Sequence, residues 1–372
     1  MDARESTTYS HTMDKNKTHN NPLDNATIAM LGNPTIMTVL PIVYSVVVVI
    51  SIPGNLFSFW VLVFHTKPIT SSVIFMINLT ITDIALALCL PFQISYHNSG
   101  NNWTFGTNLC SLVTVMFYAN MYSSIITMTC ISLERYLGVV YPLQSKPWRR
   151  KRYAVAGCVG MWLLVLLALH PLAMADLTYE VKEFNITTCF DVLKWSMLPN
   201  MAAWAVFLLA PFICFFLIPF IVTVACYFGI IRKLIQTSHK YGNGQKTRSI
   251  YLAAIVVLVF IICFAPNNFI LLVHMICRLK KKMGYYSIYK LTLCLSCLNN
   301  CIDPFIYYFA SKDFYQKFKQ LIGQKVLLND SSEYRRESVF SGRTVSTRTM
   351  SSGHMEGIVT YKPCLQRHES VF

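Results

Sequence analysis

Seven long apolar stretches alternate with short polar segments along this chain, and each is long enough to cross a bilayer as a helix. They lie at about 38–64, 72–96, 106–139, 151–173, 200–232, 248–276 and 287–310. A helix satisfies its backbone hydrogen bonds internally, so lipid tolerates it, and prolines within or near the spans are then accommodated as kinks. The pattern predicts an all-α fold, a seven-transmembrane helix bundle.

Polar segments on either side of the spans complete the predicted organisation. Residues 311–322 place phenylalanine and leucine at helical spacing among lysines, which predicts a short amphipathic interfacial helix after the seventh span, in contact with membrane lipids. The residues beyond it are rich in serine, threonine and arginine and predict a disordered tail. The four expected parts are an extracellular tail, the seven-span domain, the interfacial helix and a cytoplasmic tail, at 1–37, 38–310, 311–322 and 323–372.

The charge of the loops predicts the orientation of the chain. Residues 140–153 and 232–248 each hold five lysines or arginines and no acidic residue, as expected of cytoplasmic loops. Residues 174–198 hold four acidic residues against two lysines, and we place them outside. With seven spans, the N-terminus is then extracellular and the C-terminus cytoplasmic, at the plasma membrane. The basic residues 278–282 also fall outside and break the rule.

The composition agrees with a membrane protein. Charged residues make up only 13% of the chain and hydrophobic residues 54%, whereas soluble domains are about a quarter charged. The net charge is +15, but it gathers in the short segments between apolar stretches, where it sets topology. We therefore expect no binding of nucleic acid.

Four Asn-X-Ser/Thr sequons fall in segments predicted to lie outside. This motif accepts N-linked glycan on extracellular segments. The expected glycosylation sites are Asn16, Asn25, Asn102 and Asn185.

Acidic side chains within the predicted spans are the first candidates for function, and there are three: Asp83, Glu134 and Asp303. Ionisable groups are costly in lipid and are usually functional there. Two of these acids accompany short oxygen-bearing side chains on other spans, which suits a small hard cation such as sodium. The candidate sodium ligands are Asn55, Asp83, Ser124, Asn299 and Asp303. In the alternative, one carboxyl carries a proton; we expect no other cofactor.

Glu134 and Arg135 are adjacent at the predicted inner interface. An arginine beside an acid can hold a local pair and then release it toward another partner. Tyr227 and Tyr307, near the cytoplasmic ends of the fifth and seventh spans, are the candidate partners. A contact with two arrangements is what a conformational switch requires.

No spacing of residues indicates catalysis. The sequence has no HExxH, P-loop or GxSxG motif and no serine, histidine and acid set, so we expect no enzyme. The alternative of another class is a membrane transporter. Such a protein would show two inverted repeats with equal numbers of spans, and seven spans cannot be divided in this way. A retinal photoprotein needs a lysine in the middle of the seventh span, and Lys290 lies too near its outer end.

A set of motifs, in the order of the spans, resembles the rhodopsin-like (class A) family of G-protein-coupled receptors over about residues 38–322. The motifs are Gly54-Asn55, Asn78-Leu-Thr-Ile-Thr-Asp83, Cys110, Glu134-Arg135-Tyr136, Pro142-Leu143, Trp162, Pro219 with Tyr227, Phe260-x-x-Cys263-Phe264-Ala265-Pro266 and Asp303-Pro304-Phe-Ile-Tyr307. The residues Glu134, Phe264 and Asp303 replace commoner ones and are typical of the purinoceptor-like branch.

The resemblance implies a receptor that converts binding of an extracellular ligand into activation of heterotrimeric G proteins. It implies a disulfide between Cys110 and Cys189, and contact of Arg135 and Leu143 with the G protein. The Rho-activating twelve/thirteen class is favoured, with the inhibitory class second. The implied switch residues are Glu134, Arg135, Tyr136, Tyr227, Phe260, Phe264, Pro266, Pro304 and Tyr307.

The predicted ligand follows from a departure within that branch. Nucleotide-binding members carry a His-x-x-Arg/Lys on the outer sixth span, where this chain reads Asn268-Phe-Ile-Leu271 and offers no cation for phosphate. A basic rim over an apolar wall instead fits an anionic amphiphile such as a lipid acid, a lysophospholipid or a peptide-conjugated lipid. A nucleotide-activated receptor is the alternative, and ordinary packing also explains the aromatic wall. The candidate ligand contacts are Tyr96, Phe117, Tyr118, Tyr122, Phe269, Leu272, Arg278, Lys280, Lys281, Lys282 and Lys290.

The C-terminal tail predicts regulatory partners. Its many serines and threonines suit phosphorylation by receptor kinases followed by arrestin binding. The ending Ser370-Val371-Phe372 has the Ser-x-hydrophobe form that a PDZ domain binds as an added strand.

Overall fold

The structure is a computed structural model, and it describes residues 28, 31–192, 197–236, 243–279, 286–310, 314–315 and 319–320. In that part of the chain, six helical stretches are long and apolar enough to cross a membrane, and two shorter helices in line form the seventh span. The elements are α2 (Pro34–Trp60), η1 (Val61–His65), α3 (Ser71–Asn98), α4 (Thr107–Val140), α5 (Lys151–Met174), β1 (Thr178–Val181), β2 (Ile186–Cys189), α6 (Met201–Pro211), η3 (Phe212–Leu217), α7 (Ile218–Gln236), α8 (Asn243–Val259), η4 (Phe260–Phe264), α9 (Ala265–Leu279), α10 (Tyr286–Cys297) and α11 (Asn299–Ala310).

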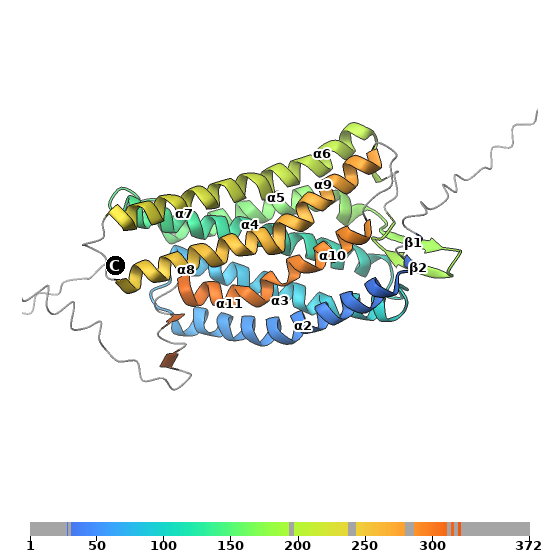
Figure 1. Cartoon of the computed structure of the whole chain (residues 1–372), viewed down its shortest axis with the longest axis horizontal. Coiled ribbons are helices and arrows are strands. Elements are labelled where there is room, and N and C mark those ends of the chain that lie inside the picture. Colours follow the sequence, from blue (N-terminus) through green and yellow to red (C-terminus); the bar gives the residue numbers. More distant parts are fainter. Residues whose placement is uncertain are drawn as a thin grey trace, which may run out of the picture. The chain divides into compact units, whose positions relative to one another are not determined.

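The spans run side by side as a bundle, with the β1–β2 hairpin beyond one end (Figure 1). Helix α4 is the most buried of the six long spans and packs against α3, α5 and α7. The predicted seven-helix fold is therefore confirmed, with the span that carries Cys110 and Arg135 at its centre.

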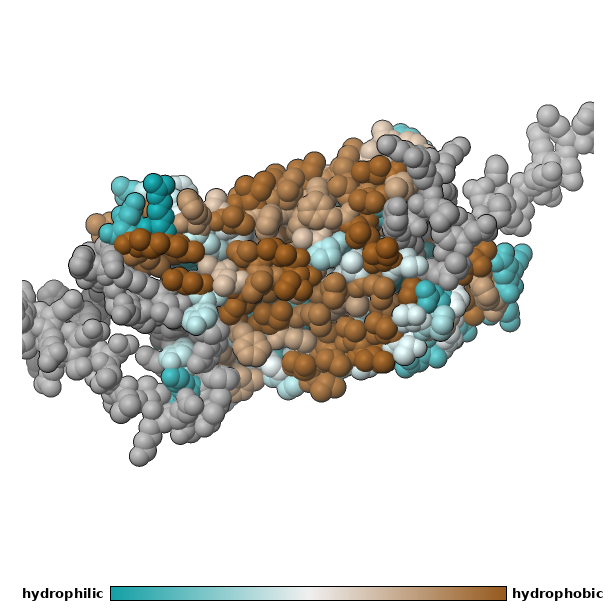
Figure 2. Space-filling view, viewed as in Figure 1, coloured by the Kyte–Doolittle hydropathy of each residue, from teal (hydrophilic) through white to brown (hydrophobic). Residues whose placement is uncertain are grey.

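The outer surface of the bundle is apolar where a bilayer would touch it. Figure 2 shows a hydrophobic belt along the helices, with hydrophilic side chains gathered toward the ends. Val49 on α2 and Leu167 on α5 are each 72% exposed. Large apolar side chains turned outward at this density favour a lipid environment over water.

Two prolines explain the π-helical segments inside the fifth and sixth spans. Pro219 lies two residues after η3, and Pro266 lies two residues after η4. A proline has no N–H to donate, and its ring clashes with the carbonyl four residues earlier, which here falls within the π-helical segment. The wider π turn accommodates that clash without ending the span.

The seventh span is broken where the sequence predicted one helix over 287–310. Helix α10 ends at Cys297, and α11 begins at Asn299. Pro304 in α11 frees the carbonyl of Asn300, four residues earlier, because proline cannot donate to it. The Asn55 side chain of α2 donates to that carbonyl at 2.9 Å. The Asn55 amide thus supplies, inside α11, the hydrogen bond that Pro304 cannot donate. At the break itself, the Leu298 N–H donates to the Leu295 carbonyl at 3.1 Å and the Cys301 N–H to the Leu298 carbonyl at 3.0 Å.

The outer hairpin is tied to the central helix. Strands β1 and β2 pair antiparallel with Thr178 opposite Cys189. The disulfide between Cys110 on α4 and Cys189 confirms the implied pairing. The loop after β2 is thereby held over the outer end of the bundle.

Several predictions lie outside the described residues. They concern most of 1–37, most of 311–322, all of 323–372, Asn16, Asn25, Lys280, Lys281, Lys282, Ser370 and Phe372, and the side chains of Arg278 and Tyr307. Within 311–322 the described residues are helical, and Phe314 is 1% exposed.

Candidate functional site

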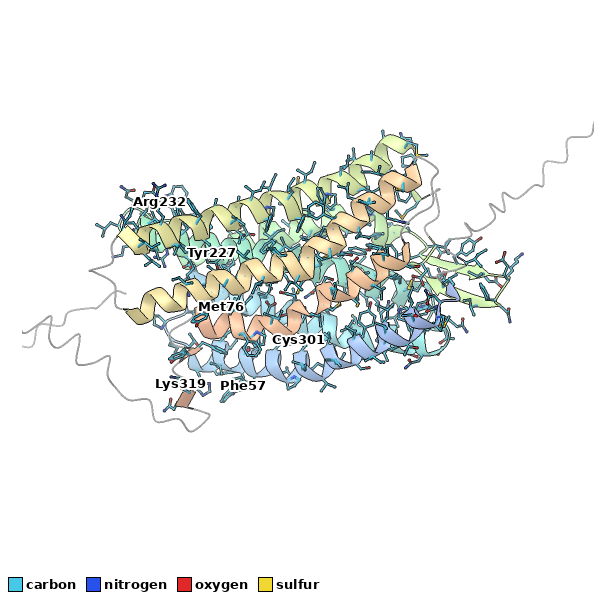
Figure 3. The ribbon with its side chains drawn as sticks, in the orientation of Figure 1. Phe57, Met76, Tyr227, Arg232, Cys301 and Lys319 are labelled. Carbon is cyan, nitrogen blue, oxygen red and sulfur yellow. A yellow bond between two sulfur atoms is a disulfide. The ribbon has the colours of Figure 1, made fainter. Side chains whose placement is uncertain are left out.

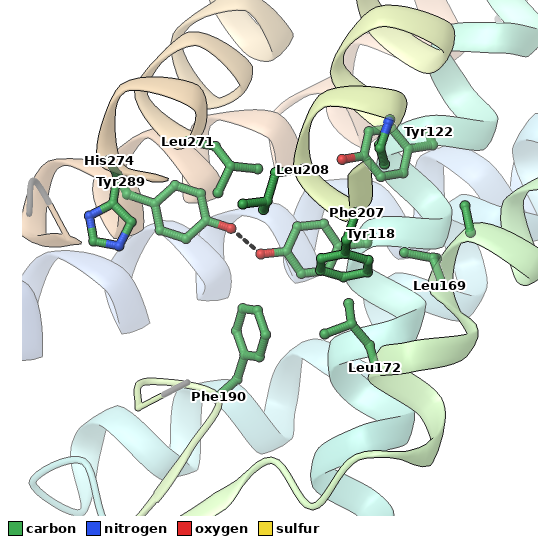
Figure 4. Close-up of a pocket in the computed structure, with 12 residues that line it drawn as sticks. Tyr118, Tyr122, Leu169, Leu172, Phe190, Phe207, Leu208, Leu271, His274 and Tyr289 are labelled. Carbon is green, nitrogen blue, oxygen red and sulfur yellow. Dashed lines mark hydrogen bonds between the residues drawn. The ribbon is translucent and has the colours of Figure 1, made fainter. Parts of the chain in front are cut away.

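A cavity in the outer half of the bundle is the candidate ligand site (Figure 4). Side chains from α4, α5, α6, α9 and α10 line it, together with one residue of the loop after β2. Almost all of the lining is aromatic or aliphatic, which suits an apolar ligand portion. The lining residues are Tyr118, Tyr122, Ala168, Leu169, Leu172, Phe190, Phe207, Leu208, Pro211, Leu271, His274 and Tyr289.

A hydrogen bond closes this cavity across its width. The hydroxyls of Tyr118 on α4 and Tyr289 on α10 bond to each other, as the dashed line in Figure 4 shows. The cavity holds only about 40 Å³, whereas pockets for drug-sized ligands measure roughly 300–1,000 Å³. In this structure the cavity is therefore too small to hold a drug-sized ligand unless its side chains move.

Phe190 enters the cavity from the loop after β2. It follows Cys189 directly and has a left-handed backbone with φ of 66°. Its N–H donates to the Leu177 carbonyl at 2.8 Å, and its ring meets Tyr118 edge-on with centroids 5.6 Å apart. The disulfide and this backbone bond hold the ring in the cavity as a plug.

The next residue, Asp191, points to a different set of partners. Its carboxylate forms an ion pair with Lys290 of α10 and accepts a hydrogen bond from the Tyr96 hydroxyl at 2.5 Å. Asp191 and Lys290 are 4% and 5% exposed. Burial alone would raise the pKa of the Asp191 carboxyl, but the Lys290 ammonium and the bonds from Lys290 and Tyr96 hold that pKa below its ordinary value.

The residues predicted to contact ligand fall in different places. Tyr118 and Tyr122 line the cavity. Phe117 packs edge-on against Tyr44 instead, with centroids 6.0 Å apart. Phe269 is 49% exposed at the side of the bundle, and Leu272 does not line the cavity.

The position of Lys290 differs from the one predicted for it in the basic rim. We expected this lysine at an open mouth, but the structure buries it against Asp191. Among the described lysines and arginines it alone is buried. The reason is physical: the short outer loop brings an acid to it, and a paired charge can be buried where a lone charge cannot.

Of the lining residues, sequence reasoning predicted only Tyr118 and Tyr122 and missed the others, which include Phe190, Leu271, His274 and Tyr289. One signal was available for Phe190, because the residue after a cysteine bonded to α4 must lie near the outer end of that helix. The others depend on how each helix is rotated about its axis, which no local pattern states.

The candidate ion site is an assembled polar cluster deep in the bundle. Asn120 of α4 donates to Asp83 at 3.0 Å, and Asn299 donates to Asp303 at 3.0 Å. The carboxyls of Asp83 and Asp303 are close enough to bond to each other when one carries a proton. The oxygens without a hydrogen-bond partner here are Oδ1 of Asn55, Oδ2 of Asp83, Oγ of Ser124, Oδ1 of Asn299, Oδ1 of Asn300 and Oδ1 of Asp303.

This donor set fits a small cation. Buried acceptor oxygens that lack a partner are costly, and a hard cation bound by carboxylate, amide and hydroxyl oxygens would satisfy them. All five predicted sodium ligands retain such an oxygen, while Asn120, which was not predicted, orients Asp83. In the part of the chain that the structure describes, no group of three or more His, Cys, Asp or Glu residues suits a transition metal.

At the cytoplasmic end, Glu134 does not pair with its neighbour Arg135 as we expected. Its carboxylate accepts a hydrogen bond from the Ser72 hydroxyl of α3, and Arg149 lies 3.4 Å away in an ion pair. Arg149 belongs to the turn before α5, and the Ser71 hydroxyl donates to its carbonyl at 2.8 Å. The acid is therefore held by the inner loop, and the expected local pair is replaced.

Arg135 lies near the predicted partner on α7, Tyr227, but its stronger electrostatic interaction is with the adjacent Glu134. Tyr227 is 3% exposed and is labelled in Figure 3, and no hydrogen bond joins its hydroxyl to Arg135. Tyr136 packs so closely on Gly229 of α7 that a Cβ at that glycine would lie 2.5 Å from its ring. Leu143, the predicted G-protein contact, is 86% exposed in the inner loop. The inner ends of α4 and α7 are thus in close contact.

Three further switch residues lie in or just after the sixth-span π segment η4. Phe260 and Phe264, both fully buried, pack edge-on with centroids 5.8 Å apart, and Pro266 follows.

Of the described sequons, Asn102 accepts a hydrogen bond from the Thr187 N–H at 3.0 Å, and Asn185 lies in the turn between β1 and β2.

Comparison with known proteins adds independent information. Residues 54–307 match the family described as 7 transmembrane receptor (rhodopsin family). The chain is 68% identical over 360 residues to purinoceptor 8 of Gallus gallus, covering 97% of this chain and 100% of that one. It is 59% identical over 350 residues to the S-geranylgeranyl-glutathione receptor of Homo sapiens, covering 94% and 98%. It is 38% identical over 273 residues to proteinase-activated receptor 1 of Xenopus laevis, covering 73% and 64%. These relatives confirm the predicted purinoceptor-like branch.

Proposed function

Since the chain belongs to the rhodopsin family of seven-transmembrane receptors, it is a multi-pass G-protein-coupled receptor rather than an enzyme, and we propose that its ligand is an anionic lipid conjugate. The ligand has an isoprenoid-like chain joined to a small acidic peptide. The human relative is named for such a molecule, S-geranylgeranyl-glutathione.

The observation that carries this proposal is the chemistry of the cavity. Its lining is almost wholly apolar and aromatic, and it suits a long hydrocarbon chain. Lys290 follows Tyr289 of the lining and supplies a buried positive charge for an acidic group. A nucleotide would present a highly charged phosphate chain to Phe190, Leu271 and Tyr118, where no described arginine or lysine lines the wall.

The test is a dose–response comparison in cells that express the chain. S-geranylgeranyl-glutathione should activate G proteins at concentrations where glutathione alone and geranylgeraniol alone do not, because each lacks one half of the recognised chemistry. Adenine and uracil nucleotides are tested in parallel as the alternative agonists. Activation by nucleotides without activation by the conjugate would establish the purinergic alternative and reject this one.

For signalling, we propose that the Rho-activating twelve/thirteen class of G proteins couples to this receptor, with the inhibitory class second. The ligand would stabilise an arrangement in which the inner sixth span moves away and Arg135 meets the G protein. Leu143 would contact the G protein beside it. Measuring Rho activation and inhibition of cyclic AMP in parallel separates the two classes.

The remaining assignments complete the proposal. The N-terminus would be extracellular, with glycan at some of the sequons, and receptor kinases, arrestin and a PDZ protein would act on the cytoplasmic tail. A sodium ion would occupy the cluster around Asp83 and Asp303 and favour the inactive arrangement, because its ligands come from several spans at once. Glycosidase treatment and surface labelling of either terminus would test the topology.

A further inference from the structure

A buried ion pair lies beside the ligand cavity. Asp191 and Lys290 are the acid and base of a pair that is nearly excluded from solvent. Burying two charges is costly, and hydrophobic residues of similar size would often serve stability as well. A buried pair in this position therefore offers a site where another charged group could replace Asp191 or Lys290.

The pair is joined to the cavity through the backbone on both sides. Phe190 enters the cavity while the next residue, Asp191, reaches Lys290. On α10, Tyr289 lines the cavity and bonds to Tyr118, while the next residue, Lys290, reaches Asp191. Separation of the pair would therefore allow the plug and the tyrosine bridge to move apart together.

The size of the cavity makes such a movement necessary. About 40 Å³ cannot hold a lipid conjugate, so the side chains that fill the site have to be displaced for binding. Asp191 is held on its other side by Tyr96, and the backbone N–H of Phe190 is bonded to Leu177, so the loop is fixed at both residues. An acidic group that reaches Lys290 would compete directly with the Asp191 carboxylate.

We infer that the Asp191–Lys290 ion pair is a latch on the ligand site, and that a carboxylate of the ligand opens it by replacing Asp191 on Lys290. This inference rests on the proposed function and deepens it, because it names the residue that recognises the acidic half of the ligand. Lys290 keeps a negative partner before and after the exchange, so no unpaired charge is left buried. Asp191 is released toward solvent as its bond from Tyr96 also breaks, and the Phe190 ring turns out of the cavity while Cys189 stays bonded to Cys110.

The exchange makes a distinctive prediction, since the two partners have opposite effects. Lys290→Gln removes the anchor for the ligand's acid, so potency of an acidic ligand should fall. Asp191→Asn removes the internal competitor, so potency of the same ligand should rise. If the ion pair served only to stabilise the fold, both variants would lose potency.

The experiment compares S-geranylgeranyl-glutathione with its dimethyl ester, which lacks both carboxylates, on the full-length receptor. In the wild type the acid should be at least about tenfold more potent than the ester, and Lys290→Gln should reduce that preference to about twofold or less. Asp191→Asn should make the acid about threefold to tenfold more potent. Lys182→Gln, at an exposed lysine in the turn of the outer hairpin, is the matched control and should leave the preference unchanged.

Folding of the variants is checked by a charge exchange. The double variant Asp191→Lys with Lys290→Asp keeps a pair of opposite charges, so it should reach the cell surface. It should nevertheless lose the preference for the acid, since the cation now lies on the moving loop. Equal potency of acid and ester in the wild type, or an unchanged preference in Lys290→Gln, would overturn the latch.

A second measurement does not depend on the ligand. A cysteine introduced by Leu271→Cys, at a lining position, should react slowly with a membrane-impermeant maleimide in the closed wild type and faster when Asp191→Asn is added. If neither conjugate activates the wild type, the proposed function fails, and the labelling rates alone decide the latch. Faster labelling in the Asp191→Asn background supports it, and equal labelling overturns it.

Discussion

Glu134 on α4 forms its ion pair with Arg149, which is 15 residues further along the chain, and not with the adjacent Arg135. The guanidinium of Arg149 also lies over Gly138, where an added Cβ would approach it to 2.9 Å. The inner loop thus folds back onto the inner turn of α4. Glu134 thus forms its ion pair with the inner loop, while Arg135 lies close to both Glu134 and Tyr227.

Arg149→Ala should raise ligand-independent G-protein activation. Without the guanidinium, Glu134 loses its partner from the loop, and the inactive contact between the loop and α4 is weakened. Arg149 is 37% exposed, so solvent screening limits the effect to about fivefold or less. Basal nucleotide exchange in membranes is the measurement, with Arg150→Ala, at the exposed neighbouring position, as the control. Equal basal exchange in both variants would contradict the role assigned to the pair.

Gly229→Ala should destabilise the receptor. The new methyl group would overlap the Tyr136 ring at 2.5 Å, so α4 and α7 would have to separate, at a cost of about 1–3 kcal/mol. Thermal unfolding of the purified receptor measures this. Gly160→Ala, where a Cβ would meet nothing within 4 Å, is the matched control and should leave the melting temperature unchanged. Adding Tyr136→Ala to Gly229→Ala should restore part of the loss, and an absence of rescue would count against this contact.

Tyr289→Phe should make a conjugate ligand more potent. The substitution removes the hydrogen bond to Tyr118 that holds the cavity closed, so opening becomes easier by about 0.5–1.5 kcal/mol, or up to about tenfold in potency. The measurement is a dose–response curve with S-geranylgeranyl-glutathione. Tyr122→Phe lines the same cavity but lies outside this bond, so it provides the comparison. A loss of potency in Tyr289→Phe would show that its hydroxyl contacts the ligand instead.

Asp83→Asn should remove a dependence of stability on sodium. A cation that binds only the folded bundle adds about 1.4 kcal/mol when its concentration is tenfold above the dissociation constant. Replacing sodium chloride by choline chloride at equal ionic strength should therefore lower the melting temperature of the wild type and leave that of Asp83→Asn unchanged. Glu180→Gln on the exposed strand β1 should behave as the wild type does. A wild type indifferent to sodium would reject the ion.

The contribution of the Asp191–Lys290 pair to stability should not change between about pH 7 and pH 5. The pKa of Asp191 is lowered in the folded state, so its stabilising effect is fully present above the ordinary pKa of an aspartate. That effect is lost only as pH falls through the lower, folded-state pKa. The difference in melting temperature between wild type and Asp191→Asn should therefore be the same at both pH values. A difference that shrinks on mild acidification would contradict the lowered pKa.

Much of the fold could be predicted because lipid imposes a simple rule on the chain. Each span has to be long, apolar and helical, so hydropathy located all seven, and the motifs within them indicated the disulfide from Cys110 to Cys189. The break after Cys297 could not be predicted. It is a tight turn at Leu298, whose carbonyl accepts from the Cys301 N–H, and it lies in an apolar stretch that hydropathy treats as one span.

The ligand site shows where sequence reasoning ends. Phe269 and Leu272 were chosen on the outer sixth span, and they lie three residues apart on one face of α9. The cavity is lined instead by Leu271 and His274, on the neighbouring face. One residue along a helix is a rotation of about 100°, and only packing against the other spans fixes that rotation.

The interrupted seventh span has a mechanical consequence. Its outer helix α10 carries Tyr289 and Lys290, and its inner helix α11 carries Tyr307. At the joint between them, the backbone bonds from Leu298 to Leu295 and from Cys301 to Leu298 span three residues instead of four, and the amides of Asn55 and Asn299 bond beside them. A displacement of α10 would therefore bend this joint before it moves α11. An agonist that moves α10 and a sodium ion bound beside α11 would accordingly act on the same joint. The agonist would bend it, and the ion would hold it rigid.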